Sequence, residues 1–325
     1  MSSAAQPFYE AVRVDLGGLL DESSLSASYR EILDRALRQD GKVLSDSPRS
    51  AWPLLVLLPA GATRRDWRSG LPVASAAELV GLSTDIFDEI EDGDESPLSI
   101  EFGQPRALNA AFGLLVLAAK SLQHLPANLG APLIEGVLRA ADGQDRDLGG
   151  SEIATVPEYL SAIDRKAAAL ISGCCEAGAL LAGLGGEAAA AYARFGAHYG
   201  RMAQILNDLR GAVDPGKGSL AGRLGTLPYV FALGGQEAPI REAIREHLAE
   251  SDRLTPKGSR NLRRALVEAG AYHFCWAMAE TEHAHASECL ASALGDAAPL
   301  LASLLLPANR PIDWYLSSGI CQRDR

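Results

Sequence analysis

The feature of this chain that most constrains its fold is a succession of long segments whose apolar residues recur at helical spacing. Within residues 26–38 the apolar side chains share one helix face: Tyr29, Ile32, Leu33 and Leu37. No alternating strand pattern of useful length occurs, and no fixed-period repeat. Hydrophobic residues make up 47% of the chain and aromatics only 6%, a balance that favours helices over strands. We therefore predict a single all-α domain over residues 1–325, built as a layered bundle.

Gly and Pro mark the expected ends of these helices. Pro53, for instance, suits the first turn of a helix whose following residues are apolar all round. The predicted helical ranges are 8–15, 26–38, a helix that begins near Pro53 within the segment 48–60, 73–92, 108–124, 131–141, 157–184, 187–209, a segment beginning near 226, 238–251, 258–294 and 296–306.

An acidic segment closes one of these helices. Residues 83–94 read STDIFDEIEDGD and hold six carboxylates in twelve positions. Asp88 and Asp92 stand i, i+4 on one face, with Asp85 one turn earlier. Like charges at that spacing, at a helix C-terminus, oppose both each other and the helix dipole. Oxygen ligands on one face suit a hard divalent cation such as Mg²⁺. A solvated helix end running into a loop is the alternative.

A second cluster of oxygen ligands lies far along the chain. Gln204, Asn207 and Asp208 occupy i, i+3 and i+4 and share a helix face. Two such helices facing each other across a bundle would suit a diphosphate bridged by Mg²⁺. Lys217, in the loop PGKGS, could reach the same phosphates. Lys166 lies in mid-helix and would be costly to bury without an anionic partner.

Charge and cysteine usage exclude several classes of partner. The net charge of −11 makes a nucleic acid or an anionic membrane an unlikely ligand by electrostatics. The longest apolar runs are too short to span a bilayer. Five cysteines without a paired pattern, and a polar start without a signal peptide, favour a reducing cytoplasm.

Five segments in the right order resemble the polyprenyl synthetase family, which has the class I isoprenoid synthase fold. PRSAWPLLVLL resembles the family's GGKRxRPxL, and DEIED resembles its first Asp-rich motif, DDxxD. DGQDRDL resembles GQxxDL, and IDRKAAALISGCCEAGALLAG resembles the Lys-Thr helix and the small-residue helix after it. QILNDLRG followed by GKGSLAGRLGTLP resembles QxxDDxxD and GKxxGxDLxxxKxTLP. The resemblance covers about residues 39–233.

The resemblance implies a helical bundle around a central apolar cavity, in which Mg²⁺ ions, up to three, help to ionise an allylic prenyl diphosphate. It also implies a homodimer. The residues it assigns as metal ligands are Asp88, Glu89, Asp92, Asn207 and Asp208. Lys166 and Lys217 match its diphosphate-binding lysines, and Gln144 and Gln204 match its polar wall. The catalytic set is then Asp88, Asp92, Lys166 and Asp208. Asn207 and Gly211 replace two acids of the second motif, so that half of the site is depleted.

Departures from the family pattern concern the second substrate, isopentenyl diphosphate. Of the basic residues in the first segment only Arg49 remains as a substrate-binding candidate, and Trp52 replaces an arginine. Glu101 stands where Arg follows the first acidic motif in the family. Each lost charge-assisted contact is worth about 1.5–3 kcal/mol. We therefore predict transfer to an acceptor without a diphosphate, such as an aromatic or a peptide. The alternatives are a terpene cyclase and, less favoured, an ordinary chain-elongating synthase or a non-catalytic partner subunit.

The floor of the cavity is expected at the residues four and five positions before the first acidic motif. These are Thr84 and Ser83, which we take as substrate-binding residues. Both side chains are small, so we predict a deep cavity for a chain of C15 or longer.

Three residues near the C-terminal end have a spacing reminiscent of metal sites, namely His283, His285 and Cys289. Two positions apart on a helix, the two histidines face different directions. We therefore predict no zinc site built from these three residues.

Overall fold

The computed structural model describes residues 5–63, 66–94, 96–149, 153–214, 219–235, 238–250 and 254–306. Every regular element in these ranges is a helix, which confirms the all-α fold class. None of the described helices is long and apolar enough to cross a membrane. The extension to one domain over residues 1–325 stays a prediction.

The helices follow one another through short connections. In the first half of the chain they are α1 (Gln6–Asp21), α2 (Ala27–Leu37), α3 (Trp52–Ala62), η1 (Trp67–Gly70), α4 (Leu71–Glu91), α5 (Pro97–Phe102), α6 (Gln104–Leu122) and α7 (Ala127–Leu148). In the second half they are α8 (Val156–Ile163), η2 (Asp164–Ala168), α9 (Ala169–Leu181), α10 (Gly186–Gly211), α11 (Leu220–Arg223), α12 (Leu227–Gly234), α13 (Ala238–Glu250), α14 (Pro256–Glu268), α15 (Ala271–Leu294), η3 (Gly295–Ala297) and α16 (Ala298–Leu305).

Local sequence explains how several of these helices begin. The Ser26 side chain caps α2 by accepting a hydrogen bond from the Tyr29 amide. At the start of α8, Thr155 and Glu158 form a reciprocal capping box. Proline occupies the first turn of α3, α4 and α14, where its missing amide proton costs no intrahelical bond.

Four predicted helices differ clearly from those observed. The helix predicted over 8–15 is longer and extends over Gln6–Asp21 as α1. The helix predicted over 258–294 is two helices, because Gly270 takes a left-handed conformation (φ 74°) that ends the first and begins the second. The helix predicted over 157–184 is interrupted by the π-helical turn η2. The helix predicted over 131–141 instead continues through Leu148 as part of α7. The short helix α5 was not predicted; Ser96 caps it.

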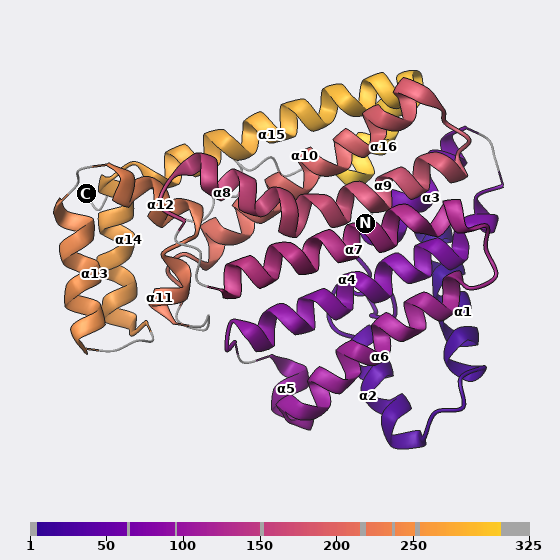
Figure 1. Cartoon of the computed structure of the whole chain (residues 1–325), viewed down its shortest axis with the longest axis horizontal. Helices are drawn as coiled ribbons and strands as arrows, with labels where there is room; N and C mark the ends of the chain where they lie inside the picture. The colour runs from indigo at the N-terminus through magenta and orange to yellow at the C-terminus, as the bar shows by residue number, and fades with distance from the viewer. Residues whose placement is uncertain are drawn as a thin grey trace.

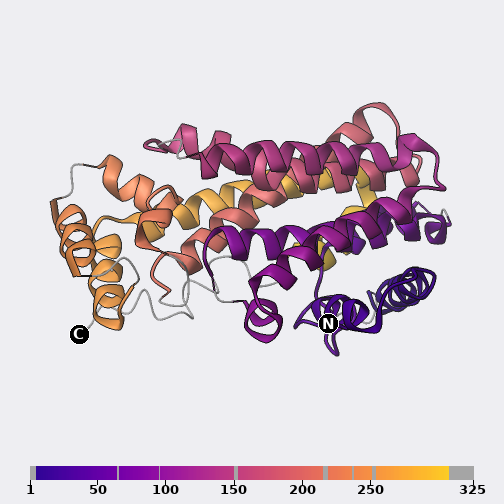
Figure 2. The same cartoon turned by 60° about the horizontal axis from the view of Figure 1, so that its bottom comes forward.

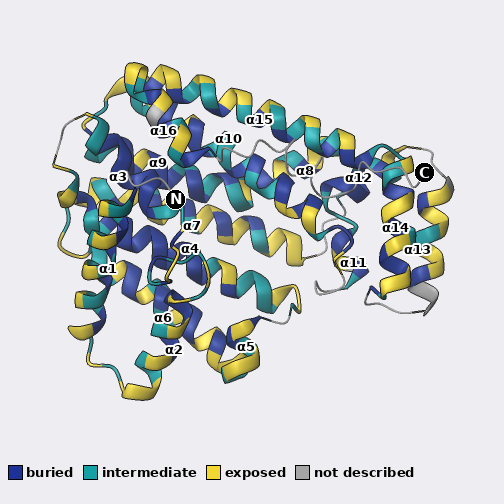
Figure 3. Ribbon diagram, turned by 180° about the vertical axis from the view of Figure 1, so that it is seen from behind, coloured by how far each residue is buried: buried dark blue, intermediate teal, exposed yellow. Residues whose placement is uncertain are grey.

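The long helices α4, α7, α10 and α15 run in roughly the same direction along the molecule, and α13 and α14 form one end of it (Figure 1). Seen from a second side, α1 and α2, drawn in indigo, form an outer layer (Figure 2), in which α1 packs against α4 and α3 and α2 packs against α6. α10 packs between α9 and α15, while α4 packs against α6 and α3. Buried residues line the inward faces of these helices and exposed residues the outward ones (Figure 3). The core is therefore a layered helix bundle, as predicted.

Two glycines let neighbouring helices approach the π-turn η2 at backbone distance. A Cβ on Gly143 of α7 would lie 2.8 Å from the Lys166 backbone nitrogen. A Cβ on Gly200 of α10 would lie 2.8 Å from the Cα of Ala168. Any larger residue at either position would push these helices away from η2, so the two glycines fix where Lys166 sits.

Candidate active site

A cavity of about 1100 Å³ lies between α4, α7, η2 and α10. Part of its wall is made of apolar side chains, among them Trp52, Phe87, Leu115, Val137, Leu170 and Ile171. The volume is at the upper end of the roughly 300–1,000 Å³ of typical small-molecule sites. Such a wall suits a hydrocarbon chain rather than a polar ligand.

Charged residues line the rest of the cavity, and acids outnumber bases. Among the described residues that line it, nine are acidic: Asp40, Asp85, Asp88, Glu89, Glu91, Asp92, Asp94, Glu101 and Asp145. Four are basic: Arg35, Arg38, Lys42 and Lys166. With five more carboxylates than cations, the cavity would repel an anionic diphosphate unless additional positive charge is supplied.

Lys166 brings positive charge to the acidic end of α4. Its Nζ lies 3.7 Å from Asp88 Oδ1 and 3.5 Å from Asp147 Oδ2 on α7. Its side chain is only 21% exposed, so the ammonium is held at the cavity wall rather than in bulk solvent. Gln144 of α7 also reaches α4, where its Nε2 donates to Glu91 Oε2 over 2.5 Å. The residues predicted on α4, α7 and η2 thus meet in one place.

Burial makes Asp88 hard to ionise. The pKa of Asp88 is raised to about 6, mainly by desolvation in the cavity; the charge of Lys166 lowers it, and the charges of Asp92, Asp85 and Glu91 raise it. A cation bound between these carboxylates would relieve the repulsion. This is a physical reason to expect one here.

The second motif is split between the cavity surface and the core. Gln204 and Asn207 of α10 line the cavity. Asp208 is buried, and its carboxylate accepts hydrogen bonds from Tyr159 Oη (2.7 Å) and Gln204 Nε2 (2.8 Å). Burial raises the pKa of Asp208 to about 6 despite these bonds. Asp208 does not line the cavity in this structure, and it holds α10 to α8 instead.

The structure does not bring two predicted substrate-binding residues to the cavity. Ser83 is fully buried, and its hydroxyl donates to the Ala111 carbonyl of α6, so its placement at the cavity floor is corrected. Arg49 lies on the loop before α3 and does not line the cavity itself, although it pairs at 2.6 Å with Asp40, which does. Thr84 does line the cavity. Lys217 lies outside the described residues.

Three cations of the cavity were missed by the sequence analysis: Arg35, Arg38 and Lys42. Lys42 could have been found, because Gly41-Lys42 repeats the Gly-Lys of the family's GGKRxRPxL motif. Lys42 precedes Pro53 by eleven residues rather than the four of that motif, so the alignment on Pro53 concealed it. The two arginines follow helical spacing on α2 and carry no motif.

The donors at the end of α4 fit Mg²⁺. Asp88, Glu89 and Asp92 all line the cavity and offer the carboxylate oxygens that this ion prefers. From α10 only the neutral amides of Asn207 and Gln204 face the same space. The fit therefore rests mainly on the first acidic motif.

Known proteins resemble this chain in sequence and in fold. A family model for polyprenyl synthetases matches residues 29–256. The geranylgeranyl diphosphate synthase of Mycobacterium tuberculosis is 31% identical over 58% of this chain and 59% of its own length. The farnesyl diphosphate synthase of Geobacillus stearothermophilus is 26% identical over 75% of this chain and 89% of its own. A decaprenyl diphosphate synthase from Rhodobacter capsulatus shares the fold, with a TM-score of 0.78 at 17% identity over 98% of both chains. The chain belongs to the polyprenyl synthetase family.

Proposed function

We propose that the protein is a prenyltransferase that ionises an allylic prenyl diphosphate with the help of Mg²⁺. The observation that carries this proposal is the meeting of Asp88, Asp92 and Lys166 at the polar end of an apolar cavity. The polar end would hold the diphosphate and the apolar wall the prenyl chain. Family membership supports the same class of substrate.

Each group has a defined task in this proposal. Asp88 and Asp92, with Glu89 beside them, would hold Mg²⁺, and Asn207 would add a neutral oxygen from α10. Bound there, Mg²⁺ supplies positive charge that stabilises the departing diphosphate. Lys166 would donate to the same phosphate oxygens, and Gln144 and Gln204 would complete the polar wall. Asp208 would keep α10 in position through Tyr159.

The cavity supports a substrate of C15 or longer. Its volume of about 1100 Å³ and its apolar wall leave room for an extended chain beyond the diphosphate end. Thr84, small and on the wall, does not close that space. Water is a poor competitor for a cation formed deep among apolar side chains.

We favour an acceptor that carries no diphosphate. The cations on the α2 side of the cavity are already paired with carboxylates. Arg35 pairs with Glu101 at 2.8 Å, Arg38 pairs with Asp34 at 2.6 Å, and Lys42 pairs with Asp85. A second diphosphate would have to displace these carboxylates from three cations, in addition to the displacement of Asp88 and Asp147 from Lys166 by the first diphosphate, whereas a neutral acceptor would not.

Chain elongation with isopentenyl diphosphate is the second candidate. Arg35, Arg38 and Lys42 all line the cavity, and released from their partners they could bind a second diphosphate. The relatives named above as geranylgeranyl and farnesyl diphosphate synthases favour this reading. The two candidates differ in one reagent and can be separated directly.

The test incubates the purified protein with Mg²⁺ and geranyl, farnesyl or geranylgeranyl diphosphate, with and without isopentenyl diphosphate. Pyrophosphate release is measured together with the organic products. Release that needs a non-diphosphate acceptor supports the first candidate. Longer diphosphates formed only with isopentenyl diphosphate establish the second, and hydrocarbons without any acceptor establish a cyclase. No release from any substrate, with candidate acceptors present, would leave only the non-catalytic partner subunit.

We further propose a homodimer through α6. Leu108, Phe112 and Val116 stand i, i+4 and i+8 on this helix and are 45%, 62% and 52% exposed. Three large apolar side chains on one exposed helix face form a stripe that suits burial against a second copy. α7 carries two more such residues, Ile134 and Leu138.

A further inference from the structure

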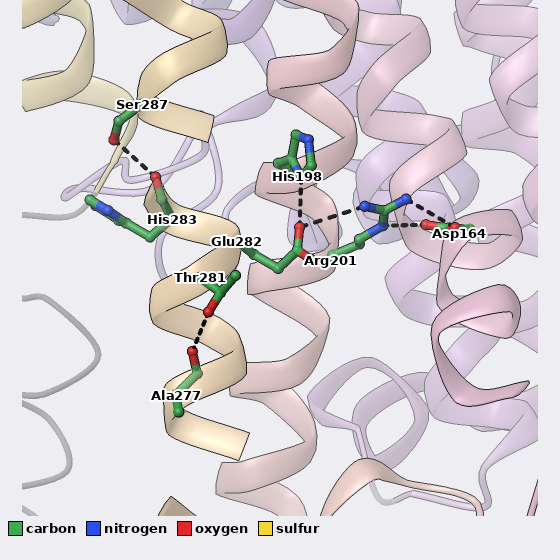
Figure 4. A network of polar contacts seen from close by, with 8 residues as sticks. All are labelled: Asp164, His198, Arg201, Ala277, Thr281, Glu282, His283 and Ser287. Atoms are coloured by element: carbon green, nitrogen blue, oxygen red, sulfur yellow. Dashed lines mark hydrogen bonds and ion pairs between the residues drawn. The ribbon is translucent and has the colours of Figure 1, made fainter. Parts of the chain in front are cut away.

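A polar cluster away from the cavity joins α10, α15 and η2 (Figure 4). His198 Nδ1 of α10 lies 2.7 Å from Glu282 Oε2 of α15. Arg201, one turn further along α10, lies 3.7 Å from the same oxygen. Two guanidinium nitrogens of Arg201 also bind the Asp164 carboxylate at the start of η2. Glu282 is only 6% exposed, so these contacts are made inside the helix interface.

His285 completes a set of three metal-ligand side chains. It follows Glu282 by three positions and so lies on the same face of α15. Its ring centroid is 5.1 Å from that of His198. One ligand atom each from His198, Glu282 and His285 lies within 4.8 Å of the others. Figure 4 shows Glu282 pointing toward α10 and His283 pointing to the opposite side of α15.

The donor types select the class of ion. Two imidazoles and one carboxylate are a common donor set for zinc, whereas Mg²⁺ prefers oxygen ligands. Glu282 uses Oε2 for both of its contacts described above. Among the described residues no hydrogen bond reaches Oε1, which leaves that oxygen available as a ligand.

The local charge also favours a cation. Glu282 and Asp164 each contribute one negative charge and Arg201 one positive charge, so the cluster carries a net charge of −1 with both imidazoles neutral. Arg201 is held by two bonds to Asp164 and by a longer contact to Glu282. Its charge is therefore largely matched by Asp164, and the charge of Glu282 remains to attract an ion.

We propose that His198, Glu282 and His285 form a Zn²⁺-binding site that ties α15 to α10. Ligand atoms around a tetrahedral zinc with bonds of about 2.0–2.1 Å lie about 3.3 Å apart. His285 is exposed, so its ring can move to close the remaining distance, and a water molecule can fill the fourth position. The ion would stabilise the position of α10, the helix whose Arg201 also binds Asp164 of η2.

The test measures zinc binding to the full-length protein after removal of metals with a chelator. Zinc chloride is titrated by calorimetry in the presence of excess Mg²⁺, which occupies carboxylate sites, and of a thiol-free reductant. We expect one equivalent bound and a higher thermal unfolding temperature with zinc. His285→Ala, at an exposed position, should lose both effects, and His198→Ala should do the same.

His283→Ala is the matched control. It removes an imidazole two positions away on the same helix. Among the described residues, the one side chain that bonds to His283 is Ser287, which donates to its backbone carbonyl and not to its ring. This variant should bind zinc as the wild type does. The proposal is overturned if the wild type binds no zinc, or if His285→Ala binds it as tightly as His283→Ala.

Discussion

Lys166 is held at the cavity by Asp88 and Asp147 from two different helices. If it stabilises the departing diphosphate, its loss should affect the ionisation step rather than the fold. We expect Lys166→Ala to lower the rate of pyrophosphate release by about 10²- to 10³-fold, the usual effect of removing one preorganised charge-stabilising group. Steady-state pyrophosphate release with Mg²⁺ and a prenyl diphosphate measures this. Lys120→Ala is the control, since Lys120 pairs with Ser23 away from the cavity and should leave the rate unchanged.

Asp88 should show opposite effects on activity and on stability. Asp88→Asn is expected to abolish Mg²⁺-dependent pyrophosphate release, because the amide is a much weaker ligand for a divalent ion. The pKa of Asp88 is raised from 3.8 to about 6, so ionising it costs folding free energy. That cost is absent below pH 3.8 and complete above pH 6. The Asn variant should therefore match the wild type in acid and unfold at a higher urea concentration than the wild type at pH 7, as urea titrations at the two pH values can show.

At the residue scale, most of the helical positions predicted for the site line the cavity, but Ser83 and Asp208, also on helices, are buried away from it. Asp88, Asp92 and Gln204 line the cavity as expected because helical spacing fixes the face on which each side chain lies. Arg49 and Lys42 lie in the loop before α3, where tertiary contacts decide the direction of each side chain. No spacing rule applies there. Arg49 was therefore predicted at the cavity but does not line it, and Lys42, which does line it, was missed.

The loop between α2 and α3 is held by a buried acid on α4. Glu78 Oε1 accepts from the Val43 amide at 3.0 Å, and the Ser50 hydroxyl donates to Oε2. Glu78→Ala would leave both donors without this partner in a buried place. We expect the free energy of unfolding to fall by about 2–3 kcal/mol, in line with the cost of stranding buried polar groups.

Glu78→Gln is the control for that change, because its amide oxygen can still accept from Val43 and its size is nearly the same. Urea unfolding of both variants at one pH provides the comparison. Equal losses in the two variants would contradict the role of the acceptor oxygen. Because this loop carries Lys42 into the cavity, the Ala variant should also raise the KM for the diphosphate.

At the element scale, the π-turn η2 was the largest departure from expectation. Residues 157–184 are apolar at helical spacing throughout, and that pattern cannot distinguish a π-turn from an α-helical one. Gly143 and Gly200 approach this turn from two neighbouring helices. In the sequence, both glycines are far from the turn and from each other. Only the packed structure shows that they act on the same segment.

For the whole molecule, the bundle was predictable because its helices, their order and the family motifs all point to one architecture. The contacts between helices could not be predicted, because they join residues that are far apart in the sequence. His285 illustrates this. Its spacing from His283 and Cys289 in the sequence predicts no metal site, but in the fold α10 brings the ring centroid of His198 to 5.1 Å from that of His285. The sequence pattern describes one helix at a time, while a site that joins two helices requires their packing.

The exposed stripe on α6 concerns the assembly of the whole molecule. If Leu108, Phe112 and Val116 pack against a second copy, a charge in the middle of the stripe should separate the copies, because it would be buried without a partner. We expect Phe112→Glu to elute as a monomer in size-exclusion chromatography with light scattering, while the wild type elutes as a dimer. Val14→Glu is the matched control, since Val14 is 77% exposed on α1 and outside the stripe. A wild type that is monomeric, or a Phe112→Glu variant that stays dimeric, would contradict an interface at α6.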